Sequence, residues 1–168
     1  MKLLTFSILI LLFASTAVLS QTEKQIVSIR AEVAAINNSA AKYDKKTKNI
    51  AGISTEGAEA TYYLSGKGLK KIVVQIYGET FRATNEFYYG GEELIFAYQK
   101  FSRYNGSIGS KPPPKIARIE EARLYRSGDQ TIRILLDKKA LKPGEIAFTE
   151  KEYELIEFSA QLKAELDK

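Results

Sequence analysis

The sequence predicts an α+β domain: an antiparallel β-meander of about six strands, covered by an amphipathic helix from each end of the chain. Apolar residues recur at spacings of three and four over 23–41 and 150–167, which is the helical period. Between 58 and 137 polar and apolar residues alternate, and glycines recur where hairpin turns are expected. Residues 21–168 have the length of a single domain.

The first twenty residues have the order of a secretory signal peptide. Lys2 supplies a positive charge, an apolar run extends from Leu3 to Phe13, and a stretch of small residues ends at Ser20. The apolar run is shorter than the ~20 residues that a membrane-spanning helix needs. We therefore expect an exported protein, periplasmic or extracellular, with no integral membrane span after cleavage. An uncleaved anchor is the alternative.

The helix expected over 23–41 begins with a capping box, in which Thr22 caps and Gln25 reaches back. Its apolar stripe comprises Ile26, Ile29, Val33, Ile36 and Ala40. The basic segment 42–48 has no such pattern and is expected to be a connector.

Glycine-containing turns predict three hairpins between residues 58 and 104. A loop at 66–68 aligns Tyr62 with Ile72. A two-residue loop at Gly78-Glu79 aligns Ile76 with Phe81 and brings Lys71 opposite Glu86.

The third hairpin turns at Gly90-Gly91, which aligns Phe87 with Leu94 and Ala83 with Tyr98. In these registers the apolar residues of four strands share one face, which favours the assignment.

A stiff proline-containing connector is expected over 105–115. The hairpin after it turns at 127–129 and aligns Leu124 with Ile132, which also sets Arg123 against Arg133. A second capping box at Thr149 then begins the C-terminal helix, 150–167.

The architecture follows from the apolar face of the meander, which must be covered. Two amphipathic helices are available to cover it, and the other face of the sheet would remain open. The alternative is a strongly curved half-barrel with one helix in its concavity. The open face is expected to carry Tyr63, Lys71, Gln75, Tyr77, Arg82, Thr84, Glu86, Tyr88 and Gln99.

Three segments have the spacing of aromatic-glycine hairpin units: Tyr62-Tyr63-x-x-Gly66, Gly78-Glu79-Thr80 and Glu86-Phe87-Tyr88-Tyr89. In them the chain resembles uncharacterised exported bacterial β-meander proteins of the MORN-variant kind. The resemblance covers about 26–104 and 122–137, but a strict repeat period is missing and the last hairpin has a different turn. It implies an exported β-sheet protein and supplies no catalytic residue.

The composition excludes several kinds of chemistry. The chain has no histidine and no cysteine, which excludes Ser-His-Asp and Cys-His catalysis and the usual zinc and copper ligand sets. Gly106-x-x-Gly109 lacks the Lys-Ser/Thr of a phosphate loop, and no EF-hand loop is present. We therefore predict no catalytic residue, no metal site and no cofactor.

Carboxylates leave one route to catalysis, because glycosidases need only two of them. Within Glu92-Glu93 and Glu120-Glu121 the neighbouring side chains point to opposite faces of a strand. A cross-strand pair such as Glu86 with Glu121 remains, so a carboxylate hydrolase of glycans stays an alternative.

The open sheet face is the predicted binding site, since tyrosine and arginine are enriched where proteins recognise ligands. A purely structural interpretation is that tyrosine suits strands. The candidate ligand-binding residues are Tyr63, Lys71, Tyr77, Arg82, Glu86 and Tyr88, with Arg103 and Tyr104 framing one end of the face.

The function predicted first is a non-enzymatic binding module for a protein or an envelope polymer. An envelope accessory protein that docks by strand addition is a further alternative. The net charge of +5 is spread along the chain without a basic stripe, so nucleic acid is not expected.

Overall fold

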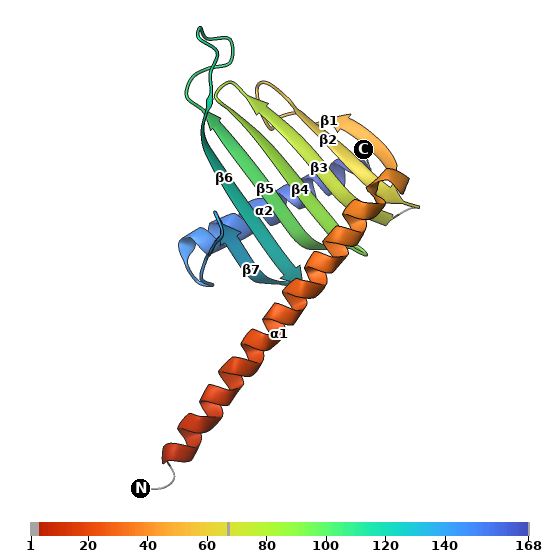
Figure 1. Cartoon of the computed structure of the whole chain (residues 1–168). Helices are drawn as coiled ribbons and strands as arrows, with labels where there is room; N and C mark the ends of the chain where they lie inside the picture. Colours follow the sequence, from red (N-terminus) through yellow and green to blue (C-terminus); the bar gives the residue numbers. More distant parts are fainter. Residues whose placement is uncertain (1–3, 67, 168) are drawn as a thin grey trace.

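A computed structural model describes the backbone of residues 4–66 and 68–167, with side chains from residue 21 onward apart from residue 67. It shows an α+β fold with an open antiparallel sheet and a long helix on each side of it (Figure 1). The predicted signal peptide, residues 1–20, lies outside the residues whose side chains are described. Among the helices in the described part of the chain, none is long and apolar enough to cross a bilayer.

The sheet has eight strands, arranged side by side in the order of the sequence. They are β1 (Asp44–Asn49), β2 (Ala58–Ser65), β3 (Gly68–Gly78), β4 (Phe81–Gly90), β5 (Glu93–Tyr104), β6 (Ile116–Ser127), β7 (Gln130–Leu136) and β8 (Lys139–Ala140).

The prediction of about six strands missed β1 and β8. The sequence of β1, DKKTKN, has no apolar alternation, because this strand lies at the edge of the sheet and pairs only with β2. Its strand conformation comes from ladder hydrogen bonds, and lysines are common on such edges because they discourage further pairing. β8 is only two residues long.

The first helix, α1, covers Leu4–Ser39 and is followed by a 3₁₀ turn, η1 (Ala40–Lys42). Thr22 therefore lies inside α1 and does not cap it. The C-terminal helix, α2 (Ile146–Leu166), begins before the predicted cap at Thr149. The earlier start brings Phe148, in the first turn of α2, into the core.

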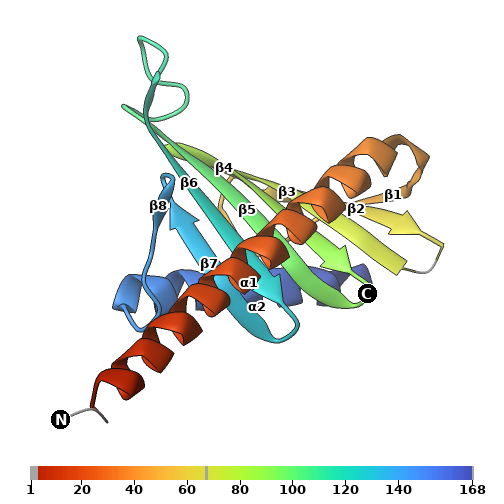
Figure 2. The same ribbon diagram turned by 60° about the horizontal axis from the view of Figure 1, so that its bottom comes forward.

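The two helices lie on opposite faces of the sheet, so the expectation that both cover one face is wrong (Figures 1 and 2). α2 covers the main apolar face, where Leu155 and Leu162 pack against Tyr62, Phe87 and Leu124.

α1 covers part of the other face through a smaller cluster, in which Ile26 and Ile29 pack with Tyr125, Phe96 and Leu135. Both faces of the sheet therefore carry apolar clusters, and a single apolar face was too simple an expectation.

The predicted register holds in the first hairpin and shifts in the next. Tyr62 lies opposite Ile72, as expected. The β3–β4 turn is Glu79-Thr80, so Gly78 pairs with Phe81. A Cβ on Gly78 would lie 2.2 Å from the Phe81 ring, so any larger residue there would have to displace that ring. This two-residue shift leaves every side chain on its predicted face.

The β4–β5 hairpin differs more, because it contains a β-bulge. The turn is Gly91-Glu92, and the register shifts between Tyr88 and Tyr89, leaving Ile95 without a partner. Beyond the bulge Phe96, Tyr98 and Lys100 fall on the α1 face. Gln99, predicted for the open face, falls on the α2 face instead, where its amide contacts Glu154 and Lys151.

The β6–β7 register also differs from the prediction. Leu124 lies opposite Ile134, and Arg123 lies opposite Leu135. The predicted juxtaposition of Arg123 with Arg133 is therefore absent, and both arginines pair with carboxylates instead.

Candidate functional site

α1 covers only one end of its face of the sheet. Its contacts begin at the β6–β7 hairpin, where Gln25 Nε2 donates to Ser127 Oγ (3.1 Å), and end at β3, where Asn37 contacts Lys71. Figure 1 shows the helix crossing this end of the strands. The other end of the same face, next to the β3–β4 turn, has no helix over it.

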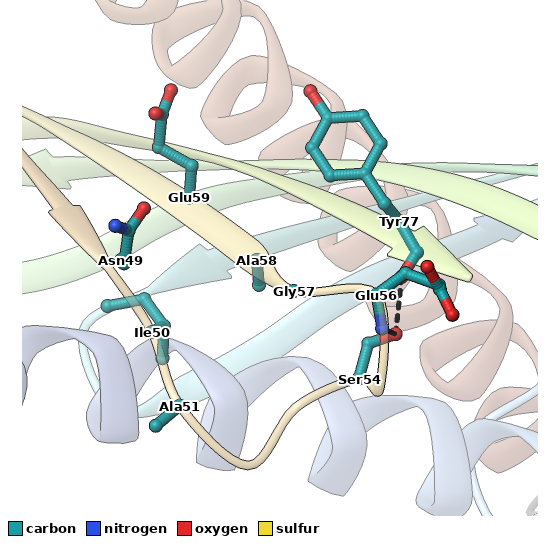
Figure 3. Close-up of a pocket in the computed structure, with 9 residues that line it drawn as sticks. All are labelled: Asn49, Ile50, Ala51, Ser54, Glu56, Gly57, Ala58, Glu59 and Tyr77. Carbon is teal, nitrogen blue, oxygen red and sulfur yellow. Dashed lines mark hydrogen bonds between the residues drawn. The ribbon is translucent and has the colours of Figure 1, made fainter.

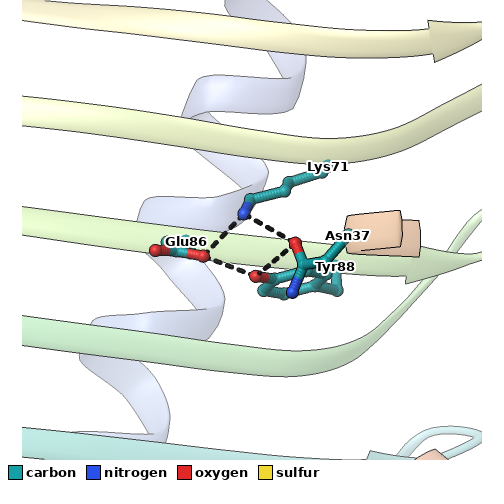
Figure 4. A network of polar contacts seen from close by, with 4 residues as sticks. All are labelled: Asn37, Lys71, Glu86 and Tyr88. Atoms are coloured by element: carbon teal, nitrogen blue, oxygen red, sulfur yellow. Dashed lines mark hydrogen bonds and ion pairs between the residues drawn. The ribbon is translucent and has the colours of Figure 1, made fainter. Parts of the chain in front are cut away.

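Under the last turns of α1 lies a polar network of Asn37, Lys71, Glu86 and Tyr88 (Figure 4). Lys71 Nζ forms an ion pair with Glu86 Oε2 (2.7 Å) and donates to Asn37 Oδ1 (3.0 Å). The Tyr88 hydroxyl lies 2.5 Å from Glu86 Oε2 and 3.1 Å from Asn37 Oδ1. Lys71 Nζ also lies 4.6 Å from the centroid of the Tyr88 ring.

This network is structural. Tyr88 is only 2% exposed, and burial first, then the hydrogen bond to Glu86, raises the pKa of its hydroxyl. The lysine and the glutamate neutralise each other. These side chains attach α1 to β3 and β4, so they do not form the ligand-binding surface that the sequence predicted.

A second paired carboxylate, Glu121, lies two strands farther along, on β6. Glu121 accepts hydrogen bonds from the Tyr98 hydroxyl (2.8 Å) and from Arg123 Nη2 (2.8 Å). These bonds, that from Tyr98 first, lower the pKa of Glu121. Burial and the bond to Glu121 raise the pKa of Tyr98 to about 12.

Glu86 and Glu121 do share one face of the sheet, as the hydrolase alternative requires. Each, however, is paired with its own cation, Lys71 or Arg123. A glycosidase needs one carboxyl that keeps its proton, whereas the pKa of Glu121 is shifted the opposite way. The geometry therefore does not favour this pair as an acid and base.

The uncovered end of the α1 face contains a hollow of about 300 Å³, here called the sheet hollow. Its lining comprises Gln75 and Tyr77 from β3, Arg82 and Thr84 from β4, and Lys100 and Ser102 from β5. These residues are neighbours in the strand ladders, where Tyr77 lies opposite Arg82 and Thr84 lies opposite Lys100.

The sheet hollow is polar and positively charged. Thr84 Oγ1 donates to Gln75 Oε1 (2.8 Å), which orients the amide of Gln75. Arg82 and Lys100 form no ion pair with any residue that the structure describes. Glu121 is the ladder neighbour of Lys100, but its carboxylate is held by Arg123.

A second hollow of about 440 Å³, here called the edge hollow, lies between the β1–β2 loop and the end of β3. Its lining includes Asn49, Glu56 and Glu59, and it shares Tyr77 with the sheet hollow (Figure 3). The Ser54 hydroxyl donates to the Tyr77 carbonyl, which ties the loop to β3. The Tyr77 side chain is 49% exposed between the two hollows.

The structure divides the predicted binding residues into separate groups. Tyr77 and Arg82 line the sheet hollow, whereas Lys71, Glu86 and Tyr88 form the network beneath α1. Tyr63 faces the same side but lies against Lys45, whose Nζ is 5.3 Å from its ring centroid.

The structure places Arg103 off the predicted face, whereas a role for Tyr104 at one end of that face stays a prediction. Arg103 lies against the ring of Phe101 on the α2 face, with 5.5 Å between Cζ and the ring centroid. Tyr104 ends β5, and its N–H donates to the Thr80 carbonyl (2.8 Å). The correction for Arg103 follows from the bulge near the start of β5, which reverses the predicted facing of that strand.

Sequence reasoning missed Lys100 and Ser102 for the same reason. In the predicted register Gln99 pointed to the open face, so its neighbour Lys100 pointed away. The run Gly90-Gly91-Glu92 also permits the turn one residue later that the structure adopts, but that change alone keeps each side chain on its face, and only the bulge brings Lys100 and Ser102 to the α1 face.

Comparisons with protein-family models, with curated protein sequences and with solved structures find no match to this chain.

Proposed function

We propose that the chain is an exported, non-enzymatic binding module, and that a protein segment or an envelope polymer docks on the uncovered end of the α1 face. The sheet hollow supports this proposal most directly. It joins side chains of three strands and contains two cations, Arg82 and Lys100, that form no ion pair with the described residues. The export part of the proposal rests on the signal-like sequence of residues 1–20.

The chemistry of the lining favours binding over catalysis. The sheet hollow presents hydroxyls, an amide and two cations, which recognise a ligand by hydrogen bonds and charge. A hydroxyl nucleophile such as Ser102 needs an adjacent base, and the lining includes no carboxylate.

Strand addition is a second candidate, favoured by one observation. β1 is a six-residue edge strand whose residues are almost all exposed, so its outer backbone groups are open to a partner strand. Two of its lysines already have other contacts, because Lys45 lies against Tyr63 and Lys48 Nζ donates to the Glu165 carbonyl (2.7 Å).

Affinity capture tests the proposal, with protein starting at Gln21 as bait and the native envelope and culture medium as sources. The double variant Arg82→Ala, Lys100→Ala removes the cations of the sheet hollow. Its matched control, Lys139→Ala with Lys142→Ala, removes the same charge from exposed positions at β8 and just beyond it.

We expect a partner that the parent and the control retain and that the hollow variant loses, with circular dichroism showing that all three proteins are folded. Identical capture by all three would count against the sheet hollow as the binding site. Retention by the hollow variant together with loss on shortening β1 would favour strand addition.

A further inference from the structure

We infer that the two hollows form one track that binds a linear acidic polysaccharide in which charged and uncharged sugar units alternate. The acidic group would lie between Arg82 and Lys100, with a sugar ring against Tyr77. This inference rests on the proposed function and specifies its ligand.

The two hollows are neighbours on the sheet and share one lining residue. Tyr77 lines both, and Glu59 of the edge hollow lies opposite Gln75 of the sheet hollow in the β2–β3 ladder. In Figure 3 the side chains of Glu59 and Tyr77 project to the same side of the sheet. From β1 to β5 the track crosses four strand spacings, roughly 19 Å, which suits an extended chain better than a single small molecule.

The sheet hollow has a local excess of positive charge. Its neighbours on the same face are ion pairs, Lys71 with Glu86 and Arg123 with Glu121. Arg82 and Lys100 are left, on β4 and β5, with the Thr84 and Ser102 hydroxyls on the same strands. The Thr84 hydroxyl already donates to Gln75, so the two cations are the groups that would bind a carboxylate or a sulfate by charge-assisted hydrogen bonds.

A hydroxylated ligand fits this lining better than a protein surface does. The sheet hollow contains no aliphatic side chain, whereas the buried core of a protein interface is largely apolar. Tyr77, about half exposed between polar neighbours, offers a flat aromatic face of the kind on which a sugar ring can stack.

The charge reverses along the track, which determines the pattern of the ligand. The edge hollow contributes the carboxylates of Glu56 and Glu59, with Asn49 beside them. These carboxylates accept hydrogen bonds from sugar hydroxyls or amides, but they repel a second acidic group. A polymer with an acid on every unit would therefore suffer repulsion at the edge hollow, and an alternating polymer would not.

Calorimetric titration of the 21–168 protein at low salt tests the inference with three oligosaccharides of equal length. They are a hyaluronan fragment, in which acidic and uncharged units alternate, a polygalacturonate fragment, in which every unit is acidic, and an uncharged dextran fragment. We expect the order hyaluronan, polygalacturonate, dextran. Attraction to the net positive charge of the protein alone would reverse the first two.

Single and double substitutions test which side chains contact the ligand along the track. Arg82→Ala with Lys100→Ala should weaken hyaluronan binding at least about tenfold, and Tyr77→Ala should weaken it as well. Glu59→Gln should strengthen polygalacturonate binding, because it removes the repelling carboxylate. The Lys139→Ala, Lys142→Ala control should change the Kd for hyaluronan less than about threefold, since screening limits the effect of distant exposed charges.

Three results would overturn the inference. Polygalacturonate could bind at least as tightly as hyaluronan, or the control could lose as much affinity as the hollow variant. In the third, neither acidic polymer binds, while affinity capture still returns a partner that the hollow variant loses. That last result would leave the binding-module proposal standing with a different ligand, whereas capture unaffected by the hollow variant would remove both.

Discussion

Tyr88 shows how one residue can be assigned to the correct face and still have a different role. Its hydroxyl is directed at Glu86 and Asn37, and its ring is covered by α1. An alternating pattern of polar and apolar residues indicates on which face of the sheet each side chain lies. It does not reveal that a helix from a distant part of the chain crosses that face. The same applies to Lys71, whose predicted proximity to Glu86 is confirmed as an ion pair although Tyr88 is its direct ladder neighbour.

Replacing Tyr88 by phenylalanine should destabilise the fold, because it keeps the ring and leaves the partly buried Glu86 carboxylate with one donor fewer. Loss of a hydrogen bond to a charged group costs about 1.5–3 kcal/mol. Urea unfolding followed by circular dichroism measures the difference. Tyr153→Phe, at a position 66% exposed on α2, is the control and should change the free energy of unfolding by less than about 0.5 kcal/mol. Equal effects of the two substitutions would show that the network does not stabilise the protein.

At the scale of elements, the accuracy of the predicted registers depended on the turn chemistry. The β2–β3 register was predicted correctly at Tyr62 and Ile72, although next to the turn Ser65 pairs with Gly68 and the register shifts between Tyr63 and Leu64. The β4–β5 register was not, since the run Gly90-Gly91-Glu92 permits two adjacent turns and the bulge at Tyr88/Tyr89 follows from packing. Lys100 and Ser102 could consequently not be predicted as site residues, although Tyr77 and Arg82 were.

The α2 helix offers a matched pair of substitutions, because its two sides differ sharply in burial. Leu155 is 0% exposed against the sheet, whereas Ile146, in the first turn, is 77% exposed. Leu155→Ala should lower the free energy of unfolding by about 2–5 kcal/mol, since it leaves a cavity in the main core. Ile146→Ala should change it by less than about 0.5 kcal/mol. Thermal unfolding of both variants provides the comparison, and similar losses would contradict the placement of α2.

At the scale of the whole molecule, the sequence predicted two amphipathic helices and a meander but not how they form layers. Amphipathic periodicity shows that a helix buries one side, and it contains no information about which surface that side meets. The choice depends on the second apolar cluster around Tyr125, to which the bulge adds Phe96 by turning it toward α1.

Stability should vary with pH at both extremes and little between them. The folded state lowers the pKa of Glu121, so the stability it contributes is present above the usual glutamate pKa of about 4.3 and is lost as the pH falls. The folded state raises the pKa of Tyr98 to about 12, so its contribution is present below pH ~10 and is lost as the pH rises toward that value. The chain has no histidine, which is the side chain that ordinarily titrates between these two pH ranges.

Urea midpoints measured from pH 3 to pH 11 should therefore show a plateau between about pH 6 and pH 9, with a decline on each side. Glu121→Gln should flatten the acidic decline, and Tyr98→Phe the alkaline one. A steep change within the plateau would contradict this assignment of the titrating groups.

Every strand of the sheet pairs with its neighbours in the sequence, so each hairpin could form as soon as its own residues were available. The main core, however, includes Phe148, Leu155 and Leu162, which follow all eight strands in the chain. During synthesis, and during threading through a translocation channel if the chain is exported as proposed, the sheet would therefore lack the cover for its larger apolar face until α2 arrived. The order of elements thus delays completion of the fold until after the last strand has emerged, so a chain in transit would remain loose enough to pass through a narrow pore.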